Sequence, residues 1–197
     1  DLPLSRGLGD VYKRQICKTA TLKTSSSFSD NDVMKTYWRL PKGVGELLPP
    51  RAWDLELLRR RVLDVFNQWG FDYIDPPLIE YLDALLVGSG EDLDLQTLKV
   101  VDQISGRQLG VRADMTSQAV RVDAHSVVTD GVQRLCYAGP VVFANPASTQ
   151  TSRVQLKAGA EIFGAPSIDA DVEVVGLMLE ALRVAQIPVS YTHLRAH

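Results

Sequence analysis

Two carboxylates and a hydroxyl group stand at positions of the sequence where they could together bind an ammonium group. Arg112, Asp114 and Thr116 alternate at the end of an apolar stretch, so a strand would point all three to one face of a sheet. Glu161 lies in a second apolar stretch, among the small residues of KAGAEIFG, which leave room for a ligand or for close backbone packing. Asp114 and Glu161, with Thr116 as hydroxyl partner, suit the ammonium of an amino acid.

A purely structural interpretation of these carboxylates stays open on spacing alone. A carboxylate on a covered sheet face is costly to bury without a cationic partner. The protein itself could supply that partner, if Asp114 and Glu161 paired with Arg112, Arg121 or Arg153. Such internal ion pairs are commoner than ligand sites.

Other chemistries find no support in the pattern. Arg121, Asp123 and His125 fall in a predicted helix, where a lone histidine is more often structural than a general base or metal ligand. The acidic run Gly90–Leu95 lacks the oxygen spacing of a calcium loop and is interpreted as a surface loop. No glycine-rich phosphate loop follows a strand, which excludes Rossmann and P-loop folds. We therefore expect neither a metal nor a cofactor.

Hydrophobic spacing predicts the elements that precede the candidate site. A helix should begin at Pro49-Pro50, because apolar residues recur every three or four positions up to Trp69. Gly70 then stands where a left-handed C-terminal cap belongs. The segment Phe71–Asp75 predicts a short strand. Leu98–Arg112 predicts two strands around a Ser105-Gly106 turn.

The second half of the sequence predicts two more helices and two more strands. Thr116 should cap a helix that runs to about Val128. Gly131–Phe143 and Ser152–Phe163 are predicted strands, joined by the polar loop Ala144–Thr151. A helix with an acidic first turn should follow from Ser167 to about Ala185. Strands joined through hairpins, with helices packed beside them, indicate an α+β fold on an antiparallel sheet.

Charge and composition exclude some classes of protein. The 197 residues carry a formal net charge of −3. Residues 1–37 hold six Lys/Arg and four Asp/Glu, whereas the remaining chain holds fifteen and twenty, so its body is acidic. Nonspecific nucleic-acid binding is therefore not expected. Two distant cysteines, Cys17 and Cys136, suit a reducing, cytoplasmic setting, and no apolar run is long enough for a membrane span.

Both ends of the chain differ from its body. Residues 1–37 are polar and serine-rich, and are expected to be a disordered or non-native lead-in. DVYKRQ (Asp10–Gln15) and the tail VSYTHLRAH after Pro188 both resemble translated sequencing-adapter sequence. We therefore expect three regions: the lead-in 1–37, a domain over residues 38–188, and a non-native tail over 189–197.

The order of several segments resembles a known family. Residues 37–188 are similar to the N-terminal part of a histidyl-tRNA synthetase core, and within that family to the synthetase-like paralogues that serve as regulatory subunits of ATP phosphoribosyltransferase. The segments that carry the resemblance are WRLPKGVGELLPPRAW, LRRRVLDVFNQWGFDYIDPPLIEYLDALL, LKVVDQISGRQLGVRADMTSQAVR, LCYAGPVVF and KAGAEIFG. The resemblance implies a class II aminoacyl-tRNA synthetase fold, an antiparallel sheet flanked by helices, here incomplete at its C-terminus.

One departure from the family bears on catalysis. After the Gly-Pro of its second signature motif, a synthetase carries an Arg that holds the α-phosphate of ATP, whereas this sequence has Phe143 there. A phenyl ring cannot bind phosphate. The loop Ala144–Thr151 also contains no Lys or Arg. We therefore expect no catalytic residues and no tRNA binding. A fragment of a functional histidyl-tRNA synthetase remains the alternative, and a degenerate module that serves only as an interaction scaffold is a second one.

The part of the family's site that binds the amino acid matches this sequence better than the part that binds ATP. The family's Arg-Pro-Glu-Gly-Thr element, which helps to hold the α-amino group of histidine, matches residues 112–116, and a motif carboxylate matches Glu161. A family Gln corresponds to Lys157. The resemblance thus implies a candidate histidine site of five residues: Arg112, Asp114, Thr116, Lys157 and Glu161. A Lys157–Glu161 ion pair that fills the vacated pocket is the structural alternative.

These observations favour a non-catalytic regulatory subunit of ATP phosphoribosyltransferase in histidine biosynthesis. The resemblance implies that it supports the short-form catalytic subunit, self-associates as a dimer within a hetero-oligomer, and takes histidine as effector. Neither a membrane nor tRNA is an expected partner, and a cytoplasmic location is expected.

Overall fold

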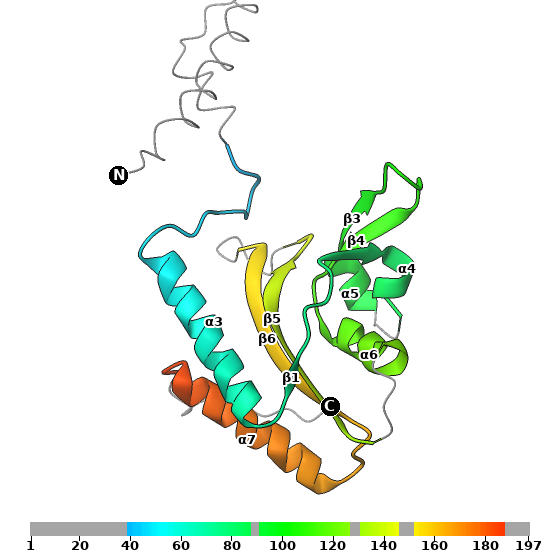
Figure 1. Cartoon of the computed structure of the whole chain (residues 1–197). Coiled ribbons are helices and arrows are strands. Elements are labelled where there is room, and N and C mark those ends of the chain that lie inside the picture. Colours follow the sequence, from blue (N-terminus) through cyan, green and yellow to red (C-terminus); the bar gives the residue numbers. More distant parts are fainter. Residues whose placement is uncertain (1–38, 88–90, 127–130, 146–151, 188–197) are drawn as a thin grey trace, which may run out of the picture. The chain divides into compact units, whose positions relative to one another are not determined.

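The computed structural model describes residues 39–87, 91–126, 131–145 and 152–187 (Figure 1). The chain divides into two compact units, residues 1–41 and 42–197, and the elements below belong to the second. The whole predicted lead-in (1–37) and the whole predicted tail (189–197) lie outside the described residues. No helix in the described ranges has the length and apolarity needed to cross a bilayer.

Helices and short strands alternate in the first part of this unit, and two long strands follow. In chain order, the elements are α3 (Arg51–Gln68), β1 (Asp72–Tyr73), β2 (Ile79–Tyr81), α4 (Leu82–Leu85), α5 (Glu91–Gln96), β3 (Leu98–Val101), β4 (Gln108–Val111), α6 (Thr116–His125), β5 (Gln133–Val142), β6 (Val154–Phe163) and α7 (Ile168–Val184).

The strands form two three-stranded sheets. One sheet has the order β1-β5-β6, in which β5 and β6 are antiparallel over their whole length and β1 is parallel to β5. The other has the order β2-β4-β3 and is antiparallel throughout. A bridge between Thr97 and Phe143 joins the two, and the Val142 amide donates to the Arg112 carbonyl at 2.9 Å. The predicted α+β class on a largely antiparallel sheet is confirmed.

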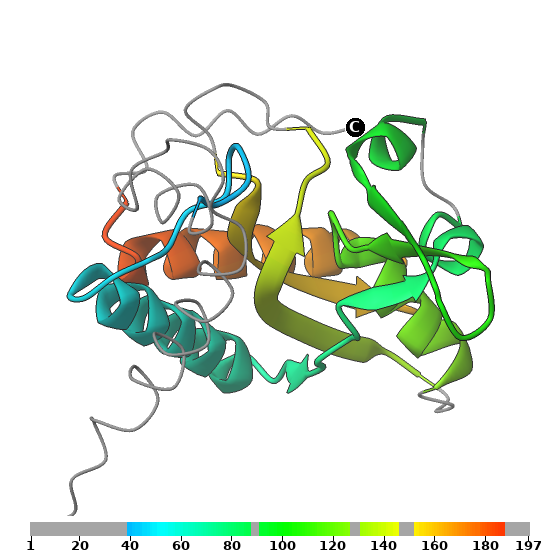
Figure 2. The same ribbon diagram turned by 90° about the horizontal axis from the view of Figure 1, so that it is seen from above.

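Two apolar layers cover the two faces of the β5–β6 pair. Helices α3 and α7 lie on one face (Figure 2), where Phe66 and Leu177 pack with Cys136. Helix α6, through Ala119, and the residue before it, Met115, cover the other face. Because side chains alternate along a strand, the residues of β5 and β6 divide between these layers.

Several element predictions are confirmed. Helix α3 ends just before Gly70, whose φ of +80° is the left-handed conformation that glycine adopts without a Cβ clash. The hairpin turns at Gly106, which also has a positive φ of +72°. Strands β5 and β6 and helix α7 lie within one or two residues of their predicted bounds.

Two local predictions were wrong. Thr116 does not cap α6, because it is already the first helical residue and Asp114 accepts the Met115 amide at 2.6 Å and the Thr116 amide at 3.3 Å. The expected acidic surface loop is largely the helix α5. Acidic side chains such as Asp92 favour a helix when they fall in its first turn, so the run is compatible with a short helix.

Candidate functional site

The candidate residues converge on the α6 side of the β5–β6 pair. Lys157, Gly159 and Glu161 alternate along β6 and therefore share a face. Gly159 is directly opposite Tyr137 of β5, so Tyr137 points to the same side. Asp114 precedes α6, which packs on this face.

Five of these residues form a continuous polar cluster, called the ammonium cluster below: Asp114, Thr116, Tyr137, Lys157 and Glu161. Lys157 Nζ lies 3.1 Å from Asp114 Oδ2. The Thr116 hydroxyl lies 3.5 Å from Asp114 Oδ1 and 3.2 Å from the Tyr137 hydroxyl. The Tyr137 hydroxyl donates to Glu161 Oε1 at 3.1 Å. The two carboxylates are thus linked through two hydroxyl groups.

The two carboxylates differ in their electrostatic environment. Burial raises the pKa of Asp114, but the Lys157 ammonium and two backbone amides outweigh it, so that this pKa is lowered overall. Burial also raises the pKa of Glu161, and the charge of Asp114 adds to it. The Tyr137 and Thr116 hydroxyls offset these effects only in part. Asp114 therefore has a cationic partner, whereas none of the ion pairs found among the described residues includes Glu161.

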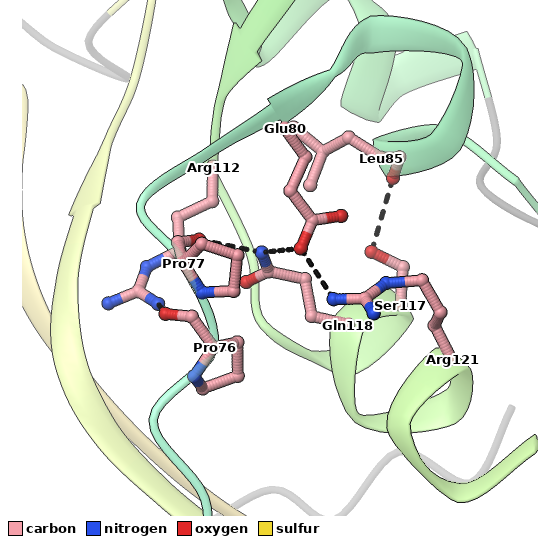
Figure 3. A network of polar contacts seen from close by, with 8 residues as sticks. All are labelled: Pro76, Pro77, Glu80, Leu85, Arg112, Ser117, Gln118 and Arg121. Atoms are coloured by element: carbon pink, nitrogen blue, oxygen red, sulfur yellow. Dashed lines mark hydrogen bonds and ion pairs between the residues drawn. The ribbon is translucent and has the colours of Figure 1, made fainter. Parts of the chain in front are cut away.

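Arg112 does not join the cluster. Strand β4 ends at Val111, so the predicted alternation over residues 112–116 is wrong. The Arg112 side chain is buried and donates from Nε to the Pro140 carbonyl at 2.9 Å and from Nη1 to the Pro76 carbonyl (Figure 3). Its role is to hold the β5 strand against the segment that follows β1.

The other arginines also bind elsewhere. Arg121 donates to Glu80 Oε1 at 2.6 Å, and Gln118 donates to the same oxygen at 2.8 Å and to the Pro77 carbonyl at 2.8 Å (Figure 3). Arg153 donates to the Phe143 carbonyl at 2.8 Å. The structural interpretation in which Arg112, Arg121 or Arg153 neutralises the two carboxylates is therefore wrong.

The alternative ion pair between Lys157 and Glu161 is also absent from the described residues. Residues four apart on a strand lie about 13 Å apart along the chain direction, because each residue adds roughly 3.3 Å. Lys157 instead pairs with Asp114 across the sheet face.

Tyr137 is the cluster residue that sequence reasoning missed. Its side chain is buried, and burial raises the pKa of its hydroxyl, which therefore stays protonated. A Cβ atom added at Gly159 would lie 2.6 Å from the Tyr137 ring and hydroxyl. The small residues around Glu161 thus make room for an aromatic side chain on the neighbouring strand, a signal that appears only when the strand register is known.

Phe143 contributes to the core and not to a polar site. Its side chain packs against the layer of Met115, Ala119, Tyr137 and Val141. Phosphate binding requires a donor or a positive charge, and a phenyl ring offers neither. Residues 146–151 of the predicted loop lie outside the described residues.

The cluster has the chemistry of a cation-binding site. The cluster holds two carboxylates and one ammonium, which pairs with Asp114 alone, so a second ammonium would balance the charge. Cys136 lies on the opposite sheet face, and burial raises the pKa of its thiol to about 11, so it is not an activated nucleophile. In the described ranges no group of three metal-ligating side chains comes together.

Comparison with known proteins adds a family and several relatives. The family model of histidyl-tRNA synthetase matches residues 43–195. The chain is 54% identical over 151 residues to the ATP phosphoribosyltransferase regulatory subunit of Marinobacter nauticus, and 51% identical over 154 residues to that of Teredinibacter turnerae. These matches cover 77% and 78% of this chain, but only 38% and 39% of the relatives.

Solved structures agree on the fold. An ATP phosphoribosyltransferase regulatory subunit/histidyl-tRNA synthetase from Bacillus halodurans is 30% identical with a TM-score of 0.69, over 77% of this chain and 39% of that one. The histidyl-tRNA synthetase of S. aureus has a TM-score of 0.59 at 17% identity, and the match covers 74% of this chain and 34% of that one. The predicted class II synthetase-like fold is thereby confirmed.

Proposed function

Because the chain belongs to the histidyl-tRNA synthetase family, we propose that it is a synthetase-like regulatory subunit that keeps an amino-acid site and performs no catalysis. It associates with the short-form catalytic subunit of ATP phosphoribosyltransferase, supports that subunit's activity and transmits feedback inhibition by histidine. The proposal rests on relatives that are 51% and 54% identical and are named as such regulatory subunits.

The observation that carries the proposal is the contrast between the two halves of the site. The ammonium cluster keeps two carboxylates within one hydrogen-bonded chain. Phe143, at the position where the family resemblance expects a phosphate-binding Arg, lies in an apolar layer. A site of this kind suits binding of the amino acid and not its activation by ATP.

Feedback would act through linkage. If histidine binds one assembly state more tightly than another, it shifts the population of active complexes by its differential affinity. The cluster residues Asp114, Thr116 and Glu161 would supply the contacts to the ammonium group, Lys157 would lie beside them in the same site, and Arg112 would support the segment that carries Asp114. Self-association as a dimer, a cytoplasmic location and the absence of tRNA binding complete the proposal.

Assembly with the catalytic subunit tests this function. The whole 197-residue chain, with an affinity tag, is expressed together with the short-form catalytic subunit of Marinobacter nauticus. A second sample is a full-length chimaera, in which residues 43–187 of this chain replace the matching segment of the Marinobacter nauticus relative. Co-purification and histidine-sensitive activity of the chimaera are expected. A chimaera that folds, as judged by circular dichroism, yet leaves the catalytic subunit unbound would contradict the proposal.

The two rival functions make different predictions. A functional synthetase fragment would support histidine-dependent ATP–pyrophosphate exchange, which Phe143 leads us not to expect. A scaffold without a ligand would co-purify with the catalytic subunit but give no heat with histidine in calorimetry.

A further inference from the structure

We propose that Lys157 is a built-in competitor for the ligand's ammonium group at Asp114, so that the ammonium cluster binds a ligand only when the Lys157–Asp114 pair opens. This inference rests on the proposed amino-acid site and specifies how its affinity is set. Lys157 thereby holds the empty site closed and weakens binding of the effector.

Lys157 carries the same charged group as the proposed ligand. The ε-ammonium of Lys157 and the α-ammonium of an amino acid are the same kind of group, a compact cation with three donors. Asp114 Oδ1 accepts the Met115 and Thr116 amides, so this oxygen is committed to the start of α6. Asp114 Oδ2 is the oxygen that Lys157 Nζ contacts at 3.1 Å. An arriving ammonium would seek that same oxygen.

The Lys157–Asp114 pair can open readily. The side chains of Lys157 and Asp114 are 42% and 30% exposed. An ion pair in which both partners keep this much contact with water contributes modestly, because water can solvate both groups and the long lysine side chain regains conformational freedom on release. Lys157 can therefore leave Asp114 for solvent at small cost, which makes the contact a modest competitor and not a permanent plug.

The charge of the whole cluster also bears on the competition. The titratable groups that face one another here are Asp114, Tyr137, Lys157 and Glu161. Lys157 pairs with Asp114, and none of the ion pairs among the described residues joins it to Glu161. A ligand ammonium is not tethered to β6, so one that displaces Lys157 at Asp114 can also be drawn toward Glu161, which is linked to Asp114 through the Thr116 and Tyr137 hydroxyls. The released Lys157 then returns to water.

A neutral side chain at position 157 tests the competition. Lys157→Gln keeps most of the length of the side chain and removes its charge. Lys99→Gln is the matched control, because Lys99 forms a similar pair with Asp94 at 2.8 Å, with side chains 40% and 41% exposed, in the other sheet. Binding is measured by calorimetry on the whole chain and on the chimaera. The ligands are histidine and histamine, which share the amine but differ in the carboxylate.

The proposal is decided by whether Lys157→Gln raises or lowers the affinity for the two ligands. We expect Lys157→Gln to bind both ligands about two- to five-fold more tightly, the size that an exposed ion pair allows, and Lys99→Gln to bind as the unsubstituted protein does. Weaker histidine binding with unchanged histamine binding would assign Lys157 to the ligand's carboxylate and overturn the proposal. Unchanged affinity for both ligands would also overturn it.

Failure of the competition at Asp114 can be distinguished from failure of the proposed partner role. If neither ligand binds any variant while the chimaera still co-purifies with the catalytic subunit, the amino-acid site fails and the partner role stands. If both ligands bind but no complex forms, the partner role fails and the competition at Asp114 is still measured.

Discussion

Tyr137 and Gly159 lie directly opposite each other in the β5–β6 ladder, and the Tyr137 ring fills the space that a side chain at position 159 would need. This pairing places the Tyr137 hydroxyl between Thr116 and Glu161, at 3.2 and 3.1 Å. The absence of a Cβ atom on one strand therefore positions the hydroxyl that links the two halves of the ammonium cluster.

Gly159→Ala should displace the Tyr137 ring, because the added Cβ would lie 2.6 Å from it. We expect a loss of about 1–3 kcal/mol in the free energy of unfolding, typical of overpacking, and weaker histidine binding. Urea titration and calorimetry measure the two effects. Gly45→Ala is the control, since no atom lies within 4 Å of its added Cβ. A Gly159→Ala protein as stable as this control would contradict the packing argument.

Asp114 has two separable roles, at the start of α6 and in the cluster. Asp114→Asn keeps an oxygen for the Met115 and Thr116 amides but loses the charge. We expect unfolding stability within about 1 kcal/mol of the unsubstituted protein and roughly tenfold weaker histidine binding, a typical loss for a charge-assisted contact. Asp114→Ala should lose both stability and binding. Equal histidine affinity in all three proteins would remove Asp114 from the site.

Glu161 should make ligand binding depend on pH. Its pKa is raised, chiefly by burial and then by the charge of Asp114. An ammonium ligand favours the charged carboxylate and lowers this pKa, so binding releases a proton when Glu161 is protonated in the free protein. Histidine affinity should therefore be greatest above the raised pKa and fall as pH decreases through it.

Calorimetry in buffers with different ionisation enthalpies detects the released proton. In Glu161→Gln the release should vanish, together with the fall in affinity that belongs to this group. An unchanged pH profile in Glu161→Gln would assign the proton to another residue.

Arg112 should contribute to the free energy of unfolding and should not contribute a charge to the ligand site. Arg112→Met removes the donor to the carbonyl of the buried residue Pro76 and the donor to the carbonyl of the exposed residue Pro140. We expect a loss of about 1–3 kcal/mol in the free energy of unfolding, because that is roughly the cost of a buried acceptor left without a donor. Arg107→Met is the control, since Arg107 is exposed in its pair with Asp83. Thermal unfolding compares the two, and equal melting temperatures would contradict the assigned role.

Sequence reasoning predicted the long elements well and the cluster in part. The apolar periodicity of α3 and the length of β5 and β6 are local signals, so these elements were predicted close to their bounds. Asp114, Thr116, Lys157 and Glu161 do converge. Lys157 pairs with Asp114 and not with Glu161, the partner that the structural alternative gave it, because the pairing depends on how α6 packs across the sheet, and no local pattern encodes that distance.

The short elements were harder for a physical reason. Strand β1 falls within the predicted strand Phe71–Asp75, but strand β2 has three residues, too few to display an alternating pattern, and was not predicted. The position of β2 depends on its pairing with β4, which is remote in sequence. Arg112 shows the same limit, because its place was inferred from a strand that ends one residue earlier.

The most direct test of the central claim is one measurement on the full-length chimaera mixed with the short-form catalytic subunit: phosphoribosyltransferase activity as a function of histidine concentration, after gel filtration of the complex. We expect a co-eluting complex whose activity histidine inhibits, with inhibition weakened by Asp114→Asn. A complex that does not form, or one whose inhibition by histidine is unchanged by Asp114→Asn, would contradict it.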